Sequence, residues 1–196
     1  MVGSNSRGAE TRTRIMATAE TLFRRQGYAG TGLAQIAGES DVRVGSIYHF
    51  FADKRALAEE SVRVGGAAYG AMVLTLLEHG AEDPVESLGA AFVAAAEDLA
   101  STDYADACPI ATLALEVAST DEVLRGATAD VFIAWIDGLS VWCRRIVDDP
   151  ELARELAIAV LTSLEGAFIL ARALRDPEPL LAAGRSLVAR AEALRR

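Results

Sequence analysis

Apolar side chains recur at every third or fourth position along most of the chain, which is the spacing of one face of an α-helix. One such stripe, near the N-terminus, consists of Ile15, Ala19, Leu22 and Phe23. No segment shows sustained alternation of apolar and polar positions, the pattern of a half-buried β-strand. The sequence therefore predicts an all-α protein, with helices at residues 10–26, 32–39, 43–50, 53–79, 85–100, 105–117, 121–147, 151–174 and 179–194.

Residues that cap or break helices mark most of these ends. Gly27 suits the left-handed conformation that commonly ends a helix, and Thr31 and Asp53 are good N-cap residues. Asp149-Pro150 separates two of the long C-terminal helices. Residues 1–9, which are rich in Gly and Ser, are expected to form a mobile leader.

The two short helices, at 32–39 and 43–50, are joined by a tight turn at residues 40–42. Apolar residues on both sides of the turn are expected to pack against each other. They are Leu33, Ile36 and Ala37 before the turn, and Val42, Ile47 and Phe51 at and after it. This spacing fits a helix-turn-helix, and it also fits an ordinary helical hairpin within a bundle.

Composition describes a globular chain and hides an uneven distribution of charge. Of the 196 residues, 52% are hydrophobic and 24% are charged, and the formal net charge is −9. Such acidity argues against nucleic acid as a partner, because attraction to phosphates needs basic contacts. Residues 1–55, however, hold eight basic and five acidic side chains, a net charge of +3, whereas the remainder has a net charge of −12. The basic excess is thus confined to the segment that contains the two short helices.

Several function classes lack their characteristic residues in this sequence. Cys108 and Cys143 cannot form a disulfide framework, the N-terminus lacks a signal-peptide pattern, and no apolar run reaches the roughly 18 residues that span a membrane. We therefore expect a cytoplasmic protein with no membrane partner. His49 and His79 lie at no metal-ligand spacing, and no nucleophile elbow or dinucleotide-binding pattern is present, so we expect no metal, no cofactor and no enzymatic activity. Cys108 before Pro109 is expected to pack as a small apolar group, with a redox-sensing thiol as the alternative.

The first quarter of the chain carries many residues at fixed spacings that together form a motif. They are Ala19, Leu22, Phe23, Gly27, Tyr28, Thr31, Ile36, Ala37, Val42, Gly45, Ile47, Tyr48, His49, Phe50, Phe51, Asp53, Lys54 and Leu57. In these positions residues 11–57 resemble the DNA-binding domain of the TetR family of bacterial transcriptional regulators. The resemblance implies a three-helix helix-turn-helix domain at residues 1–52, followed by a helical-bundle domain for ligand binding and dimerisation at residues 53–196.

The second short helix is expected to enter the major groove of DNA. In a helix-turn-helix the N-terminal end of this helix meets base edges, and the residues there are Arg43, Val44, Gly45 and Ser46. The positions at which the resemblance implies phosphate contacts are Thr31, Tyr48, His49 and Lys54. The competing interpretations are a solvated helix start, a surface lysine and a packed tyrosine. The family usually has glycine at the position of Asp41, a small hydroxyl residue at that of Arg43 and often lysine at that of Val44, so the resemblance implies no particular operator sequence.

The acidic C-terminal part carries four short motifs, at residues 107–110, 114–117, 164–167 and 170–172. In these it resembles the subgroup of the family that includes lincomycin-responsive and flavonoid-responsive repressors. The resemblance implies a dimer interface on the last two helices, for which the candidates are Leu152, Leu156, Val160, Leu164, Phe168, Leu181, Leu187 and Val188. Candidates for a ligand pocket are Tyr69, Met72, Leu76, Phe92, Leu113, Trp135 and Trp142. Packing in the core of one chain is the competing interpretation for both sets.

Motif, charge and resemblance together predict a homodimeric repressor. It would bind a palindromic double-stranded operator and be released by a small hydrophobic or aromatic effector. The alternatives are a DNA-binding regulator without a small-molecule effector, and a helical carrier of a hydrophobic ligand. A carrier would not need the basic N-terminal segment with Tyr48 and Lys54.

Overall fold

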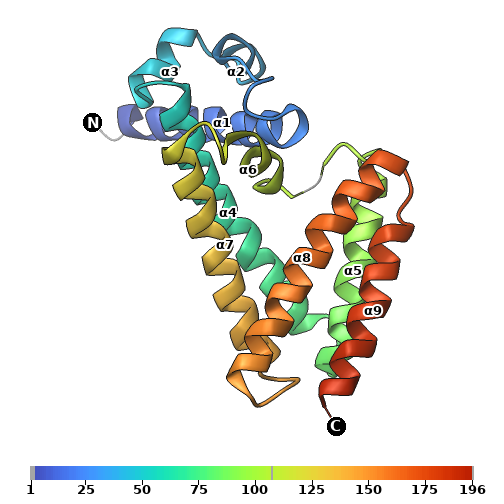
Figure 1. Cartoon of the computed structure of the whole chain (residues 1–196). Helices are drawn as coiled ribbons and strands as arrows, with labels where there is room; N and C mark the ends of the chain where they lie inside the picture. Colours follow the sequence, from blue (N-terminus) through green and yellow to red (C-terminus); the bar gives the residue numbers. More distant parts are fainter. Residues whose placement is uncertain (1–2, 107, 196) are drawn as a thin grey trace. The chain divides into compact units, whose positions relative to one another are not determined.

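The computed structural model of the protein describes residues 3–106 and 108–195, and every regular element in these ranges is a helix (Figure 1). The prediction of an all-α chain is confirmed. The helices are α1 (Gly3–Gln26), α2 (Leu33–Glu39), α3 (Val44–Phe50), α4 (Lys54–His79), α5 (Pro84–Ser101), α6 (Ala111–Val117), α7 (Glu122–Cys143), α8 (Pro150–Leu174) and α9 (Glu178–Leu194).

Two predicted N-terminal boundaries are wrong. α1 begins at Gly3, so the leader expected at residues 1–9 is helical from residue 3 onward, and residues 1 and 2 lie outside the described part. α6 begins at Ala111 rather than at residue 105. Pro109 explains the late start, because it lacks an amide hydrogen and disfavours helical backbone in the residue before it.

Gly27 and Asp53 end and begin helices as expected, whereas the N-cap of α2 is Gly32 and not Thr31. Gly27 follows α1 with a φ of +77°, the left-handed conformation that glycine adopts without steric cost. Asp41, in the turn between α2 and α3, has a φ of 52°, which aspartate tolerates better than most residues. Asp53 accepts a hydrogen bond of 2.7 Å from the amide of Ala56 and so caps the start of α4. α7, in contrast, ends at Cys143 and not at residue 147.

Contacts group the chain into two compact units, residues 1–67 with 109–131 and residues 68–108 with 132–196. The first unit therefore holds α1, α2, α3 and α6 together with the first part of α4 and of α7. Its core is apolar and comes from α1, α2, α3 and α4: Ile15, Ala19, Leu22, Phe23, Ile36, Ala37, Ile47, Phe51, Leu57 and Ala58 are all buried. Complete burial of one large apolar side chain contributes about 1.5–3 kcal/mol, so this core stabilises the packing of the four helices.

The second unit is built on α5, α8 and α9, in which α9 packs against both α5 and α8 (Figure 1). α5 and α9 approach closely at Gly184. A Cβ at this position would lie only 2.7 Å from the Cβ of Phe92. Asp83 caps α5 by accepting from the amides of Val85 and Glu86, and Arg195 at the end of α9 forms an ion pair of 2.7 Å with the same carboxylate. These contacts fix α9 against α5 at one end of the pair and near its middle.

α8 is unusually apolar for a helix with so much exposed surface. Among the described residues it is the one helix long and apolar enough to cross a membrane, with a stretch of mean hydropathy 1.7 that is 39% buried. Part of its apolar surface is therefore left uncovered by the chain itself.

Candidate nucleic-acid interface

The turn between α2 and α3 is fixed by local hydrogen bonds. The amide of Val42 donates to the carbonyl of Ala37 at 2.9 Å, and the hydroxyl of Ser40 donates to the carbonyl of Ile36 at 2.6 Å. Both side chains of the buried pair Ile36 and Ile47 have no exposed surface. The two helices are thus held as a rigid pair, with the N-terminal end of α3 directed outward from their shared core.

All four predicted base-contacting residues lie at this end of α3. Arg43 precedes the helix with extended backbone, φ −81° and ψ 149°, and its side chain is exposed. Val44 is 37% exposed, and a Cβ added to Gly45 would meet no atom within 4 Å. Ser46 is half-buried, and its amide donates to the carbonyl of Arg43 at 2.8 Å. The first three positions leave room for another molecule against the helix.

Tyr48 and His49 present polar groups on the exposed side of α3. Tyr48 is 56% exposed, so it is a surface residue and not a packed aromatic. The ring of His49 is exposed and stands edge-on to that of Phe50, with 4.9 Å between ring centroids. A phenol hydroxyl and an imidazole are both hydrogen-bond donors of the kind that contact DNA phosphates.

Thr31 is placed differently from the prediction. Its side chain is 1% exposed, and its hydroxyl donates to the carbonyl of Gly27 at 2.7 Å and accepts from Gln26 at 3.3 Å. The N-cap of α2 is Gly32, without a side-chain hydrogen bond. Thr31 therefore stabilises the turn before α2, and its hydroxyl has no free surface for a phosphate.

Lys54 lies in the first turn of α4 with its amino group over the ring of Tyr28, 4.2 Å from the ring centroid. Partial burial lowers the pKa of Lys54, and the carboxylate of Glu116 opposes this shift. The cation–π contact holds the ammonium group beside the turn that follows α1. Glu116, on α6, was not singled out by sequence reasoning, and it also accepts a 2.8 Å hydrogen bond from the amide of Ala29.

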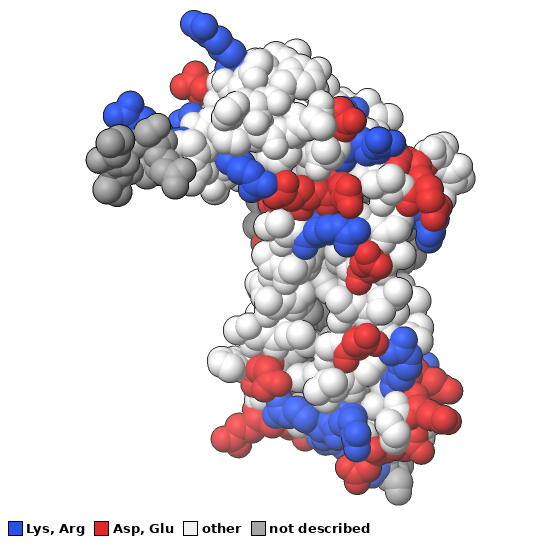
Figure 2. Space-filling view, turned by 90° about the vertical axis from the view of Figure 1, so that its left-hand side faces the viewer, with Lys and Arg blue, Asp and Glu red and all other residues white. Residues whose placement is uncertain are grey.

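Charge around this end of the molecule is mixed. Figure 2 shows scattered Lys and Arg side chains, with a few acidic ones, on the end that carries α1, α2 and α3. Much of that surface is uncharged. On this face, the basic side chains do not form a continuous surface.

The predicted pocket residues divide between the two units. Leu113 is buried in the first unit, whereas the other predicted pocket residues belong to the second. Met72 and Leu76 are 50% and 39% exposed, and Phe92 is buried between α5 and α9. Tyr69 and Trp135 do meet, with ring centroids 5.5 Å apart.

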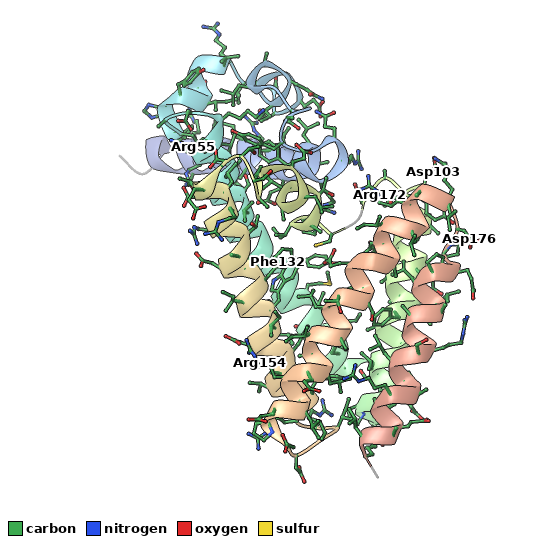
Figure 3. The ribbon with its side chains drawn as sticks, viewed as in Figure 1. Arg55, Asp103, Phe132, Arg154, Arg172 and Asp176 are labelled. Atoms are coloured by element: carbon green, nitrogen blue, oxygen red, sulfur yellow. The ribbon has the colours of Figure 1, made fainter. Side chains whose placement is uncertain are left out.

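Phe132, which sequence reasoning missed, completes an aromatic cluster in the second unit. Its ring centroid lies 5.6 Å from that of Trp135 (Figure 3). Gly70 leaves room for this cluster, because a Cβ there would lie 2.5 Å from the indole nitrogen of Trp135. The indole nitrogen of Trp142, also buried, has no hydrogen-bond partner among the described residues.

The predicted dimer residues divide into two groups. Leu156, Val160, Phe168 and Leu187 are buried inside the single chain, between 0% and 6% exposed, so nearly all of their surface packs in its core. Leu164, Leu181 and Val188 are half-buried, and Leu152 is 38% exposed. α8 also exposes four apolar residues that sequence reasoning did not propose for the dimer interface: Ile158, Ile169, Leu170 and Leu174.

A buried carboxyl group on α8 was also missed. Burial raises the pKa of Glu165 to about 7, against a smaller opposing effect from the thiol of Cys108, which donates a hydrogen bond to it. The loop that contains Cys108 is tied to the end of α8, where Arg172 donates to the carbonyl of Tyr104 at 3.3 Å and Arg175 pairs with Asp103 (Figure 3).

Burial shapes the surroundings of both thiols. Cys108 and Cys143 are both buried, and burial raises the pKa of Cys143 to about 12. A raised pKa keeps the thiol protonated and therefore unreactive. Within the described ranges, no group of three or more His, Cys, Asp or Glu residues could hold a metal ion.

Comparisons with known proteins agree with this arrangement of helices. A model of the bacterial regulatory proteins of the tetR family matches residues 15–61, and one of the C-terminal domain of LmrA/YxaF-like transcriptional regulators matches residues 84–186. A crystal structure of the regulatory protein TetR from Rhodobacter sphaeroides has the same fold, with a TM-score of 0.81 and 20% identity, covering 90% of this chain and 96% of that one.

Two Bacillus subtilis (strain 168) proteins are similar over almost their whole length. YxaF, described as an uncharacterized HTH-type transcriptional regulator, is 33% identical over 180 residues, which is 90% of this chain and 92% of the relative. The HTH-type transcriptional regulator LmrA is 30% identical over 173 residues, which is 88% of this chain and 92% of the relative. These relatives and the shared fold are those of transcriptional regulators and not of enzymes. The chain belongs to the TetR family of helix-turn-helix, DNA-binding transcriptional regulators, and its C-terminal domain is of the LmrA/YxaF-like type.

Proposed function

We propose that the protein is a homodimeric repressor that binds a palindromic operator and is released by a small hydrophobic or aromatic effector. The observation that carries the DNA-binding part is the exposed N-terminal end of α3, where Arg43, Val44 and Gly45 stand on a rigid helix pair. Arg43 can donate two hydrogen bonds to guanine, and Val44 can contact a thymine methyl group. Gly45 allows the helix backbone to approach the bases closely.

Phosphate contacts would orient α3 in the groove. Tyr48 and His49 are exposed on the same helix, and the amino group of Lys54, in the first turn of α4, lies over the ring of Tyr28. Such contacts position a protein on DNA without distinguishing bases. Thr31 has no part in them, because its hydroxyl is buried and bonded within the turn.

The apolar face of α8 supports the homodimer. Ile158 and Ile169 lie eleven positions apart, close to one side of the helix, and both are exposed. Gly166, between them, has no atom within 4 Å of an added Cβ, which leaves room for a neighbouring helix. A second copy is the occupant that a palindromic operator requires, because two recognition helices about 34–36 Å apart enter successive major grooves.

The aromatic cluster of Tyr69, Phe132 and Trp135 supports an effector of apolar or aromatic chemistry. Aromatic side chains are the usual lining of small-molecule sites in proteins. An effector that binds better to a conformation with lower DNA affinity would release the operator, and operator DNA would lower the affinity for the effector by the same factor. The match to a family of DNA-binding regulators counts against the alternative of a carrier for a hydrophobic ligand.

Binding to the DNA that flanks the protein's own gene tests the proposal. The expected result is sequence-selective binding in which the logarithm of the affinity falls linearly with the logarithm of the salt concentration. Arg43→Ala should relax base preference, whereas Tyr48→Phe should weaken binding to all duplexes alike. Absence of any selective, salt-sensitive binding would exclude the operator-binding function, and effector-independent binding would favour a regulator without a small-molecule effector.

A further inference from the structure

One carboxylate from α6 is built into the turn that connects α1 to α2. The oxygen Oε2 of Glu116 accepts a 2.8 Å hydrogen bond from the amide of Ala29, 87 positions away in the sequence. Its other oxygen, Oε1, lies 1.5 Å from the place that a Cβ on Gly27 would occupy. Both oxygens therefore lie against the backbone of the same turn, and glycine at position 27 is needed for its φ of +77° and for this approach.

The same turn carries the residue that holds Lys54. Tyr28 stands between Gly27 and Ala29, with its ring 5.9 Å from that of Phe23 and under the amino group of Lys54. Burial raises the pKa of Tyr28, and the carboxylates of Asp121 and Asp53 raise it further. The position of the Lys54 ammonium group is thus set by the position of the Tyr28 ring, and the ring is set by the backbone of the turn.

The turn also determines where α2 begins. Thr31 donates to the carbonyl of Gly27, and Gln26 donates to the carbonyl of Gly30 at 3.2 Å. These bonds are internal to the turn. The amide of Ala29 instead donates to the side chain of Glu116, which comes from a distant part of the sequence. The amide would otherwise depend on solvent.

We propose that Glu116 is a positioning residue for DNA binding: as a hydrogen-bond acceptor for Ala29 it fixes the turn after α1, and through Tyr28 it fixes Lys54 for its phosphate contact. This inference rests on the proposed operator-binding function. It assigns to α6 a part in shaping the DNA-binding surface, within the first unit. The acceptor oxygen is the required feature, and the negative charge is not.

A purely electrostatic role for Glu116 makes the opposite prediction. A carboxylate close to Lys54 repels the phosphates that Lys54 would contact, so its removal by any substitution would strengthen DNA binding. The positioning role predicts that Glu116→Ala weakens binding, while Glu116→Gln, whose amide oxygen can still accept from Ala29, does not. The two variants separate the acceptor from the charge.

The experiment compares the full-length wild type with Glu116→Ala and Glu116→Gln. Glu122→Ala is the matched control, because Glu122 is an exposed carboxylate of the same unit that pairs only with Arg125, three positions along α7. Binding to the flanking DNA is measured over a salt series, and exchange of the Ala29 amide with solvent is measured by NMR. A merely structural loss would change the folded fraction and leave the salt dependence unchanged.

The expected result is a loss of roughly tenfold in DNA affinity for Glu116→Ala, with the slope of log affinity against log salt reduced by about one, as for the loss of one phosphate contact. Ala29 should exchange faster in this variant. Glu116→Gln should stay within about twofold of the wild type, since a neutral acceptor replaces a charged one at an exposed site, and Glu122→Ala should be unchanged.

Two outcomes overturn the inference. The first arises if the wild type binds DNA selectively and Glu116→Ala binds it as tightly as the wild type or more tightly. The second is equal weakening by the Gln and Ala variants, which would show that an acceptor oxygen at this position is not sufficient. A wild type that shows no selective DNA binding would instead refute the proposed function, and the positioning role would fall with it.

Discussion

Replacing Gly27 by alanine should destabilise the first unit through two separate effects. The residue has a φ of +77°, and a Cβ there would lie 1.5 Å from the carboxylate oxygen of Glu116. Forcing alanine into the left-handed region costs about 1–2 kcal/mol. The carboxylate belongs to an exposed, flexible side chain, so it can move away, but it then loses its hydrogen bond to the amide of Ala29, worth about 1 kcal/mol.

The expected total is therefore about 2–3 kcal/mol of lost unfolding free energy for Gly27→Ala. Equilibrium unfolding in urea measures it, with the same substitution made in a Glu116→Ala background. There the carboxylate is already gone, so Gly27→Ala should cost only about 1–2 kcal/mol, the backbone part alone. Equal costs in the two backgrounds would show that the carboxylate does not occupy the space beside Gly27, and the assignment of Glu116 to this turn would be wrong.

Three further predictions concern the second unit. The folded-state pKa of Glu165 is raised from 4.5 to about 7, so the folded state loses stability as pH rises through this window. Glu165→Gln should remove about 2–3 kcal/mol of that loss. A stability difference between variant and wild type that stays constant from pH 4.5 to 8 would contradict this prediction. Gly184→Ala should cost about 1–3 kcal/mol in thermal or urea unfolding, because the added methyl meets Phe92 at 2.7 Å, and an unchanged stability would refute the close packing of α5 on α9. Leu170→Asp on the exposed face of α8 should shift the protein toward monomer in sedimentation at micromolar concentration. Val64→Asp, at an equally exposed apolar site on α4, should not. Equal behaviour of the two variants would place the dimer interface elsewhere.

The short helices were predictable because their signals are local. α2 and α3 begin within one residue of the expected positions, since apolar spacing, a left-handed Asp41 and the cap at Asp53 all lie inside one short stretch. The base-contact candidates Arg43 and Val44 follow directly, because a helix-turn-helix exposes the start of its second helix. A family motif at fixed spacings then distinguishes this arrangement from an ordinary helical hairpin.

The long helices gave less reliable predictions because their apolar residues cover more than one face. On α8, Leu156 is fully buried whereas Ile158, two positions away, is 40% exposed, and both are apolar. Spacing alone cannot assign one of them to the core and the other to a partner. The aromatic residues showed the same ambiguity: Phe92 packs between α5 and α9, and Phe132, which was not selected, joins Trp135.

Contacts between distant parts of the sequence left no local signal. Glu116 meets the turn at Gly27 and Ala29 from a helix nearly ninety positions away, and its own neighbours on α6 give no sign of this. The late start of α6 had a visible cause in Pro109, but residues 105–107 are of types that favour or tolerate helices. Asp103 and Tyr104, with φ of 53° and 61°, depart from the helical conformation before it.

Selection from a library of random DNA duplexes tests the central claim most directly. The wild type should enrich a palindrome whose half-sites are about one helical turn, or a multiple of it, apart, as two copies of α3 in successive major grooves require. Arg43→Ala should enrich the same half-site spacing with lost preference at one base position per half-site. Enrichment of no motif, or of the same motif with undiminished preference in Arg43→Ala, would contradict the assignment of α3 as the element that distinguishes operator sequence.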